Sequence, residues 1–386
     1  MLDGIRQLKN IYPMLSVLGF SNLAEVDYQY LKRTIDEWAI FDGMFISSSS
    51  GSRKPDTVCY TRFIERFELD GKSCIFVDDR LENVIAAQCL GMRCVLFDNT
   101  KTTITMLHNL LGDPVERGMA FLRENAQSHF CETSTGIRHR DNYSQLLILE
   151  STGDRYVRGK RKAKAAELSR SLVRLVNDGP TWSYLVGASE ITGTVYPDDS
   201  DTTSLAMVCW FDKSRPRFCH CICASVFRFF YLHGWGDKLP GTCAYLCSVL
   251  RSSAHLFGTR YYDNPDWIFY SLIDVCAKRP SDEGLKELRS LLRTRLQERM
   301  GCDRNPLGAA LRLVAAQGLE MQNPRDLNTL LETQQVDGGW ERVWLWRYGK
   351  EGVKIGSRGV ITALAIKVEF SLALDGYHRY RSGPIH

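Results

Sequence analysis

Residues 73–98 read SCIFVDDRLENVIAAQCLGMRCVLFD. In this stretch an apolar run ends in Asp78 and Asp79, a helical stretch near 82–90 follows, and a second apolar run begins at residue 93. Apolar runs that alternate with helical stretches, with polar residues where the strands end, are typical of a doubly wound parallel sheet. We therefore expect an α/β domain whose sites lie at the carboxyl ends of its strands.

The rest of the chain divides into two halves of different character. The same alternation precedes residue 73, with strands expected at 12–22 and 41–48 and helices near 27–36 and 56–67. After about residue 112 the spacing becomes helical, in the stretches 114–127, 165–178, 285–299, 305–319 and 359–370. The sequence thus predicts an α/β domain over 1–112 and an all-helical domain over 113–386.

Composition narrows the class of protein. The chain has 386 residues, 44% of them hydrophobic, which is enough for two cores. Its formal net charge is only +4, and no Lys/Arg block suggests a nucleic-acid partner. The start MLDGIRQLKN is charged within six residues and lacks the apolar core of a secretory signal, and no apolar window reaches the ~18 residues of a membrane span. We expect a cytoplasmic protein with reduced thiols, and we interpret the run Cys219–Cys223 as a buried helix face rather than a metal site.

The order of motifs in the first half resembles the haloacid dehalogenase (HAD) family. The resemblance covers residues 5–98 and rests on Ser21, Lys54, Asp78, Asp79 and Asn83. It implies a partial HAD-like, Rossmannoid domain in which Ser21 and Lys54 hold phosphate oxygens. The carboxylates of Asp78 and Asp79 would hold Mg²⁺, a hard cation that prefers oxygen ligands.

One element of the HAD pattern is missing. The family carries its nucleophilic aspartate at the end of an apolar first strand, whereas this sequence begins MLDGIR, with Met1 at the comparable place. Without that carboxylate no phosphoaspartate forms. We expect an incomplete or rearranged sheet and a scaffold rather than a phosphatase. The stretch DDRLE (78–82) also fits a DDxx[DE] diphosphate motif, but its place after an apolar strand favours the HAD interpretation.

An acid cluster in the second half carries the chemistry. Asp199, Asp201, Thr202 and Thr203 form the sequence DSDTT, which resembles the DxDD motif of class II terpene cyclases in a DxDTT variant. The stretch Gln335–Trp340 resembles the QxxDGxW signature of the same enzymes. By this resemblance Asp201 is the proton donor, while Asp199 and the two threonine hydroxyls orient it. Protonation of a C=C bond requires a carboxylic acid that stays neutral, and burial or a second carboxylate raises its pKa accordingly.

The whole chain resembles the fungal HAD-like sesquiterpene cyclases that make drimane skeletons. This resemblance implies an α-barrel of the β-domain type in the second half. It also implies conversion of farnesyl diphosphate to drimanyl diphosphate, with the diphosphate retained for separate phosphatases. Aromatic faces would stabilise the carbocation, and cations would hold the diphosphate. The substrate-binding candidates are Trp210, Tyr261, Trp340, Trp344, Lys350, Lys354 and Arg358.

Two alternatives stay open at the level of sequence. One is an HAD-type phosphatase, or a bifunctional cyclase and phosphatase that gives drimenol. The other, from a different class of protein, is a non-catalytic helical scaffold with a solvated DxDTT loop.

Overall fold

The structure is a computed structural model that describes residues 1–34, 39–126, 128–153, 219–232, 234–236, 239–348 and 352–368. It contains two compact units, Met1–Asp113 and a second unit that begins at Pro114. In the described ranges no helix is long and apolar enough to cross a membrane.

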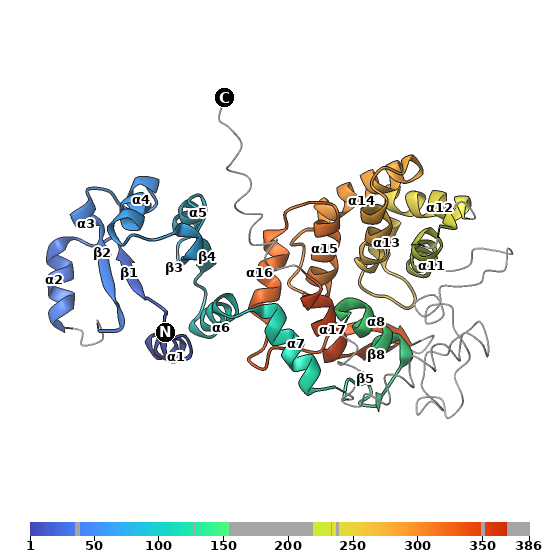
Figure 1. Cartoon of the computed structure of the whole chain (residues 1–386), viewed down its shortest axis with the longest axis horizontal. Coiled ribbons are helices and arrows are strands. Elements are labelled where there is room, and N and C mark those ends of the chain that lie inside the picture. Colours follow the sequence, from blue (N-terminus) through green and yellow to red (C-terminus); the bar gives the residue numbers. More distant parts are fainter. Residues whose placement is uncertain are drawn as a thin grey trace. The chain divides into compact units, whose positions relative to one another are not determined.

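The first unit alternates strands and helices, as the sequence predicts (Figure 1). A 3₁₀ turn at Gly71–Ser73 precedes its third strand. Its elements are α1 (Leu2–Ile11), β1 (Leu18–Ser21), α2 (Glu25–Thr34), β2 (Gly43–Ile46), α3 (Ser47–Ser50), α4 (Thr57–Arg66), β3 (Ile75–Asp78), α5 (Leu81–Gln88), β4 (Arg93–Leu96) and α6 (Thr100–Leu111).

The strands of this unit form two separate parallel pairs. β1 pairs with β2, with Leu18 opposite Gly43, and β3 pairs with β4, with Ile75 opposite Arg93. No strand joins the two pairs within the part of the chain that the structure describes. The expectation of an incomplete sheet is therefore confirmed.

An aromatic cluster holds the first unit together. The ring of Phe20 on β1 stacks on Phe63 at 4.7 Å and meets Phe45 and Tyr60 edge-on at 5.2 Å. Phe76 on β3 lies 6.0 Å from the same ring. Since aromatic pairs in these geometries stabilise beyond their area burial, Phe20 ties the core around β1 to that around β3.

The second unit is mostly helical. It also contains 3₁₀ turns at Ala254–Phe257 and Glu283–Leu285. Its elements are α7 (Pro114–Glu124), β5 (Cys131–Thr133), β6 (Arg138–His139), α8 (Asn142–Thr152), α11 (His220–Leu232), α12 (Pro240–Arg251), α13 (Trp267–Lys278), α14 (Lys286–Arg299), α15 (Pro306–Gly318), α16 (Pro324–Thr333), β7 (Trp344–Tyr348), β8 (Val353–Gly356) and α17 (Arg358–Ile366).

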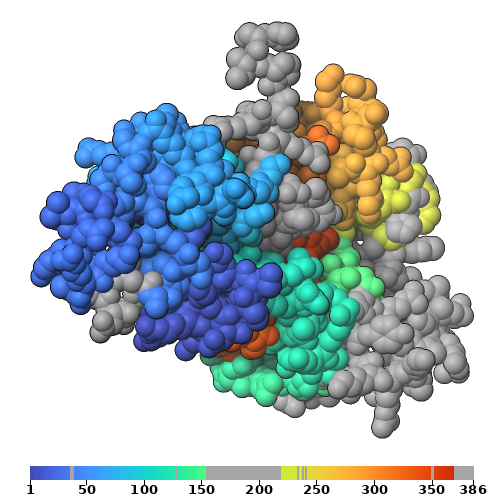
Figure 2. Space-filling model, turned by 60° about the vertical axis from the view of Figure 1, so that its left-hand side comes forward, coloured from blue at the N-terminus to red at the C-terminus, as the bar shows by residue number. Residues whose placement is uncertain are grey.

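Helix α15 forms the centre of this unit and packs against α13, α16 and α17 (Figure 1). It begins with Asn305, whose side chain accepts a hydrogen bond from the amide of Leu307, and with Pro306 in the first turn, as a capped helix does. On the surface of the unit, α12 and α14 lie side by side, in yellow and light orange in Figure 2.

Arg312 places a charge inside the helical core. Its guanidinium donates to Asp326 at 2.6 and 2.9 Å and to Asp266 at 2.6 Å, and all three side chains are fully buried. The network connects the start of α13, the middle of α15 and the first turn of α16. Removing one partner of such a network leaves a buried, uncompensated charge, so it fixes how these helices pack.

The second unit also contains a sheet, so the expectation of an all-helical domain over 113–386 was wrong. β6, β5, β8 and β7 form, in that order, an antiparallel sheet. Its strands have two to five residues, which is too short for a clear alternating pattern, and β5 and β8 are far apart in the sequence. The prediction of a buried helix face at Cys219–Cys223 is confirmed, because His220, Cys221 and Cys223 are buried on α11.

Candidate functional site

Lys54 and Asp78 form an ion pair at the carboxyl ends of β1 and β3. The Lys54 Nζ lies 2.6 Å from Asp78 Oδ2, and the two side chains are only 9% and 5% exposed. Lys54 Nζ also donates to the carbonyl of Phe20, at 2.9 Å. The ammonium group thus bridges the end of β1 to the end of β3.

Hydrogen bonds fix both partners of this ion pair. Asn22 donates to the carbonyl of Lys54 and accepts from its amide, each at 2.9 Å, and the Lys54–Pro55 peptide is cis. Asp78 Oδ1 accepts from the Asn83 side chain and from the amide of Arg80, each at 2.9 Å. Residues that are far apart in the sequence thus form one hydrogen-bonded site.

The environment keeps the Asp78 carboxylate charged. Burial by itself raises the pKa of Asp78, but hydrogen bonds from Lys54 and Asn83 outweigh burial and hold the pKa below its usual value. Asp79 is exposed. A carboxylate has about four lone-pair positions, and Asp78 uses three of them, so one remains. Two carboxylates of this kind suit a hard cation such as Mg²⁺.

In the second unit, the turn after α16 carries the QxxDGxW signature. Its glutamine is Gln334, one residue before the Gln335 expected from the sequence. Gln334 is buried and donates from Nε2 to the carbonyls of Pro114 and Gly338, each at 2.9 Å. Gly338 has φ +87°, and a Cβ there would lie 2.3 Å from the carbonyl oxygen of Arg117. Only glycine fits this close approach.

Arg358 fixes the same turn. Its guanidinium donates to both carboxylate oxygens of Asp337 at 3.0 Å and to the carbonyl of Trp340 at 3.0 Å, and it lies over the ring of Phe121. Burial raises the pKa of Asp337, but the hydrogen bonds from Arg358 and the Gly339 amide, together with the charges of Arg358 and Arg117, outweigh burial and lower that pKa. The expected diphosphate ligand Arg358 is therefore already held by a carboxylate.

The remaining predicted side chains of the second unit lie in different environments. Trp340 is fully buried and donates from Nε1 to the carbonyl of Leu330 at 3.0 Å. Tyr261 and Trp344 are half-buried, and Lys354 is exposed on β8. The structure therefore makes Lys354 the accessible cation among the predicted ones that it describes. Outside the described residues lie Asp199, Asp201, Thr202, Thr203, Trp210 and Lys350.

The sequence interpretation missed a cluster of charged side chains between α8, α11, α13 and α17. Arg228 forms ion pairs with Glu150 and Asp274, and Lys367 donates to the buried Tyr270 hydroxyl at 3.0 Å. Burial opposes the charge of Arg228, but Glu150 and Asp274 outweigh it and raise the pKa of the guanidinium. The one sequence signal was Arg228 itself, which interrupts an apolar run. The cluster thus holds positive and negative side chains in fixed positions among these helices.

The chain is similar to known sesquiterpene cyclases and to a sesquiterpene phosphatase. The family described as "Sesquiterpene cyclase astC-like C-terminal domain" matches residues 115–209. Drimenol cyclase drtB of Aspergillus calidoustus is 34% identical over 388 residues, which cover 93% of this chain and 70% of that protein. Sesquiterpene phosphatase astK of Aspergillus oryzae is 36% identical over 108 residues, 28% of this chain and 54% of that protein.

Among solved structures, the type II terpene cyclase MstE from Scytonema aligns with 69% of this chain and 98% of its own. The identity is 13% and the TM-score 0.46.

The α/β unit, the mostly helical unit and the cyclase relatives together define a terpene cyclase, an enzyme rather than a non-catalytic scaffold. More narrowly, the chain belongs to the family of drimane-type sesquiterpene cyclases that includes drimenol cyclase drtB.

Proposed function

We propose that this enzyme protonates farnesyl diphosphate and cyclises it to drimanyl diphosphate, with the diphosphate retained. The observation that carries this proposal is the similarity to drimenol cyclase drtB over 93% of the chain. The sequence DSDTT at 199–203 supports it, as does the turn that Gln334 and Arg358 hold in the second unit. On this view the second unit is a class II cyclase α-barrel of the β-domain type.

In this mechanism the second unit supplies the acid and a site that protects the carbocation from water. Asp201 donates its proton to the terminal double bond, and Asp199 with the hydroxyls of Thr202 and Thr203 orients the acid. A dry site keeps the acid neutral before the reaction, because burial raises the pKa of a carboxyl group. The carbocation then needs neighbours that are electron-rich but not nucleophilic, which aromatic faces provide. Trp210, Tyr261, Trp340 and Trp344 are the candidates for this role.

The retained diphosphate needs positive charge. Lys350, Lys354 and Arg358 are the proposed ligands. The structure describes Lys354 and Arg358, and Lys354 is the stronger candidate because it is exposed. Mg²⁺, a hard cation that prefers oxygen ligands, would be held in the first unit by the carboxylates of Asp78 and Asp79.

We further propose that the first unit is an HAD-like domain that does not remove the diphosphate. In the described residues no strand pairs between β1 and β3, where an attacking carboxylate would be positioned, and the Lys54 ammonium pairs with Asp78 instead. Separate phosphatases would then act on the product. The existence of a distinct sesquiterpene phosphatase, astK, among the relatives supports this division of labour.

A second candidate function has its own support. The relative drtB is called a drimenol cyclase, and drimenol is an alcohol. The site around Lys54, Asp78 and Asn83 is also well formed. A bifunctional cyclase and phosphatase would release drimenol directly.

One assay separates the two functions. The purified enzyme is incubated with farnesyl diphosphate and Mg²⁺, and organic extracts are compared with and without added alkaline phosphatase. A bicyclic alcohol that is seen only after phosphatase treatment supports diphosphate retention. The same alcohol without added phosphatase supports the bifunctional enzyme. Farnesol as the only terpene alcohol after phosphatase treatment contradicts cyclisation.

The proton donor is tested with neighbouring acids. Asp201→Asn removes the acidic proton at constant size, so we expect cyclisation to fall by at least about 10²-fold, the scale of one general acid. Asp198→Asn changes another acid of the same stretch of sequence and serves as the matched control. Cyclisation by Asp201→Asn at the rate of the control would contradict the assigned role.

A further inference from the structure

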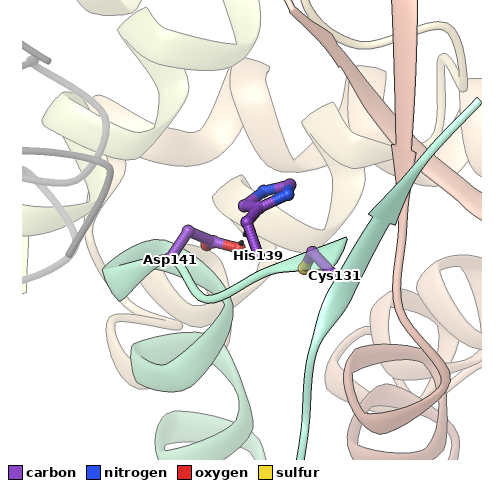
Figure 3. Close-up of side chains that lie close together, drawn as sticks. All are labelled: Cys131, His139 and Asp141. Carbon is purple, nitrogen blue, oxygen red and sulfur yellow. Dashed lines mark ion pairs between the residues drawn. The ribbon is translucent and has the colours of Figure 1, made fainter. Parts of the chain in front are cut away.

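Three potential metal ligands meet at one end of the small sheet in the second unit. Cys131 on β5 lies directly opposite His139 on β6, and Asp141 follows His139 by two residues, just before α8. One ligand atom from each side chain lies within 4.8 Å of the others. Figure 3 shows the three side chains gathered between β5 and the start of α8.

These side chains are buried and held in place. Cys131 and Asp141 are fully buried, and the His139 side chain is 8% exposed. Asp141 accepts from the amide of Ser144 at 2.6 Å and from its hydroxyl at 2.8 Å. The Ser144 hydroxyl also lies 2.9 Å from Cys131 Sγ, and His139 Nε2 lies 3.8 Å from Asp141 Oδ2. One serine thus orients two of the three potential ligands.

We propose that Cys131, His139 and Asp141 bind a Zn²⁺ ion. Thiolate, imidazole and carboxylate are the ligands that Zn²⁺ takes, at about 2.0–2.3 Å, and tetrahedral geometry places such ligand atoms about 3.3–3.6 Å apart. The present spacing therefore requires the ligand atoms to approach one another by at most about 1.5 Å. Mg²⁺ is unsuited to a thiolate and an imidazole, so this site is distinct from Asp78 and Asp79.

Charge supports the same assignment. A thiolate and a carboxylate together carry two negative charges, which Zn²⁺ cancels, and a buried site requires such compensation. Binding releases the thiol proton of Cys131 to solvent and leaves the Ser144 hydroxyl to donate to Asp141. Three protein ligands leave a fourth position for water.

The ion would join three elements of the second unit. It connects β5 and β6 to the first turn of α8, and β5 pairs in turn with β8, which leads into α17. The alternative is a purely hydrogen-bonded cap, in which Asp141 and Ser144 start α8 and Cys131 and His139 only pack against them.

The experiment uses the full-length enzyme without a histidine tag. Metal content is measured by mass spectrometry after dialysis, and the metal-depleted protein is then titrated with Co²⁺. We expect one zinc ion per chain and, with Co²⁺, the intense near-ultraviolet absorption of a thiolate–cobalt bond. Cys131→Ser and His139→Gln should lose the stoichiometric metal. Cys276→Ser, at a buried thiol on α13, should keep it.

Either of two results would overturn the site. Wild-type protein that contains no stoichiometric zinc and shows no thiolate–cobalt absorption has only the hydrogen-bonded cap. Retention of the metal in both Cys131→Ser and His139→Gln places it elsewhere. The wild-type cobalt titration needs no variant, so the proposal is tested even where Cys131→Ser fails to fold.

Discussion

Lys54→Met tests whether the ion pair of the first unit is a structural bridge. Methionine keeps most of the aliphatic stem and removes the ammonium group, whose nitrogen lies 5.1 Å and 5.4 Å from the ring centroids of Phe20 and Phe76. The Asp78 carboxylate then stays buried, with only Asn83 and the amide of Arg80 as partners.

The structure sets the size of the effect. Because both partners are at least nine-tenths buried, removing one leaves an uncompensated charge, which costs about 3–5 kcal/mol. A domain is typically stable by about 5–15 kcal/mol, so the first unit would lose a large share of its stability. The double variant Lys54→Met/Asp78→Leu removes both charges and should recover most of the loss.

Hydrogen exchange measured on peptides of the first unit is the appropriate assay, since a chain with two units need not unfold in one step. A factor of ten in the opening equilibrium corresponds to about 1.36 kcal/mol. The predicted loss of stability should therefore accelerate amide exchange through opening of the unit roughly a hundredfold to several thousandfold in β1 and β3. Cyclisation of farnesyl diphosphate at low temperature should be retained, because the proposed acid, Asp201, belongs to the sequence of the other unit.

The pH dependence gives a second readout of the same pair. The folded-state pKa of Asp78 is lowered, so its contribution to stability is fully present above its unfolded pKa of about 3.9. It is lost as the pH falls through the folded pKa. The difference between wild type and Lys54→Met should therefore be full at pH 7 and narrow in acid, where Asp78 protonates. A difference under about 0.5 kcal/mol at pH 7, or no recovery in the double variant, would refute a structural bridge.

Three further predictions concern the second unit. Gly338 and Gly352 both have a positive φ, but only at Gly338 would an added Cβ lie against backbone atoms. In urea unfolding, Gly338→Ala should therefore lower the free energy of unfolding by at least about 1 kcal/mol more than Gly352→Ala, on the order of the cost of an overpacked site. Equal losses of unfolding free energy in the two variants would contradict this prediction. Lys354→Gln should keep the free energy of unfolding within about 0.5 kcal/mol of the wild-type value and raise the KM for farnesyl diphosphate. Arg358→Gln should instead lower the melting temperature. The reverse pattern would make Arg358 the diphosphate ligand. Arg312→Met leaves the buried Asp326 without a cation, while Arg299 still pairs with Asp266, and should cost about 3–5 kcal/mol in thermal unfolding, so a wild-type melting curve would refute the network.

Local patterns in the sequence predicted what depends on local structure. The alternation at 73–98 produced β3, α5 and β4 near the expected places, because an apolar run and a helical period each reflect the chain's own geometry. The buried face of α11 followed from its cysteines in the same way. The DSDTT and QxxDGxW patterns led to the correct enzyme family, although the glutamine of the second was misplaced by one residue.

The sequence alone therefore determined the alternation of elements, the two units and the enzyme family. Only the tertiary structure decided the partners of individual side chains. From its Gly-rich stretch of sequence, Arg358 is predicted to be a phosphate ligand. In the structure its guanidinium instead pairs with Asp337, which is 21 residues away in the sequence. Likewise, Cys131 and His139 become neighbours through strand register. The physical reason is that periodicity is a property of consecutive residues, whereas ion pairs, strand pairing and metal sites join residues that only the packed core brings together.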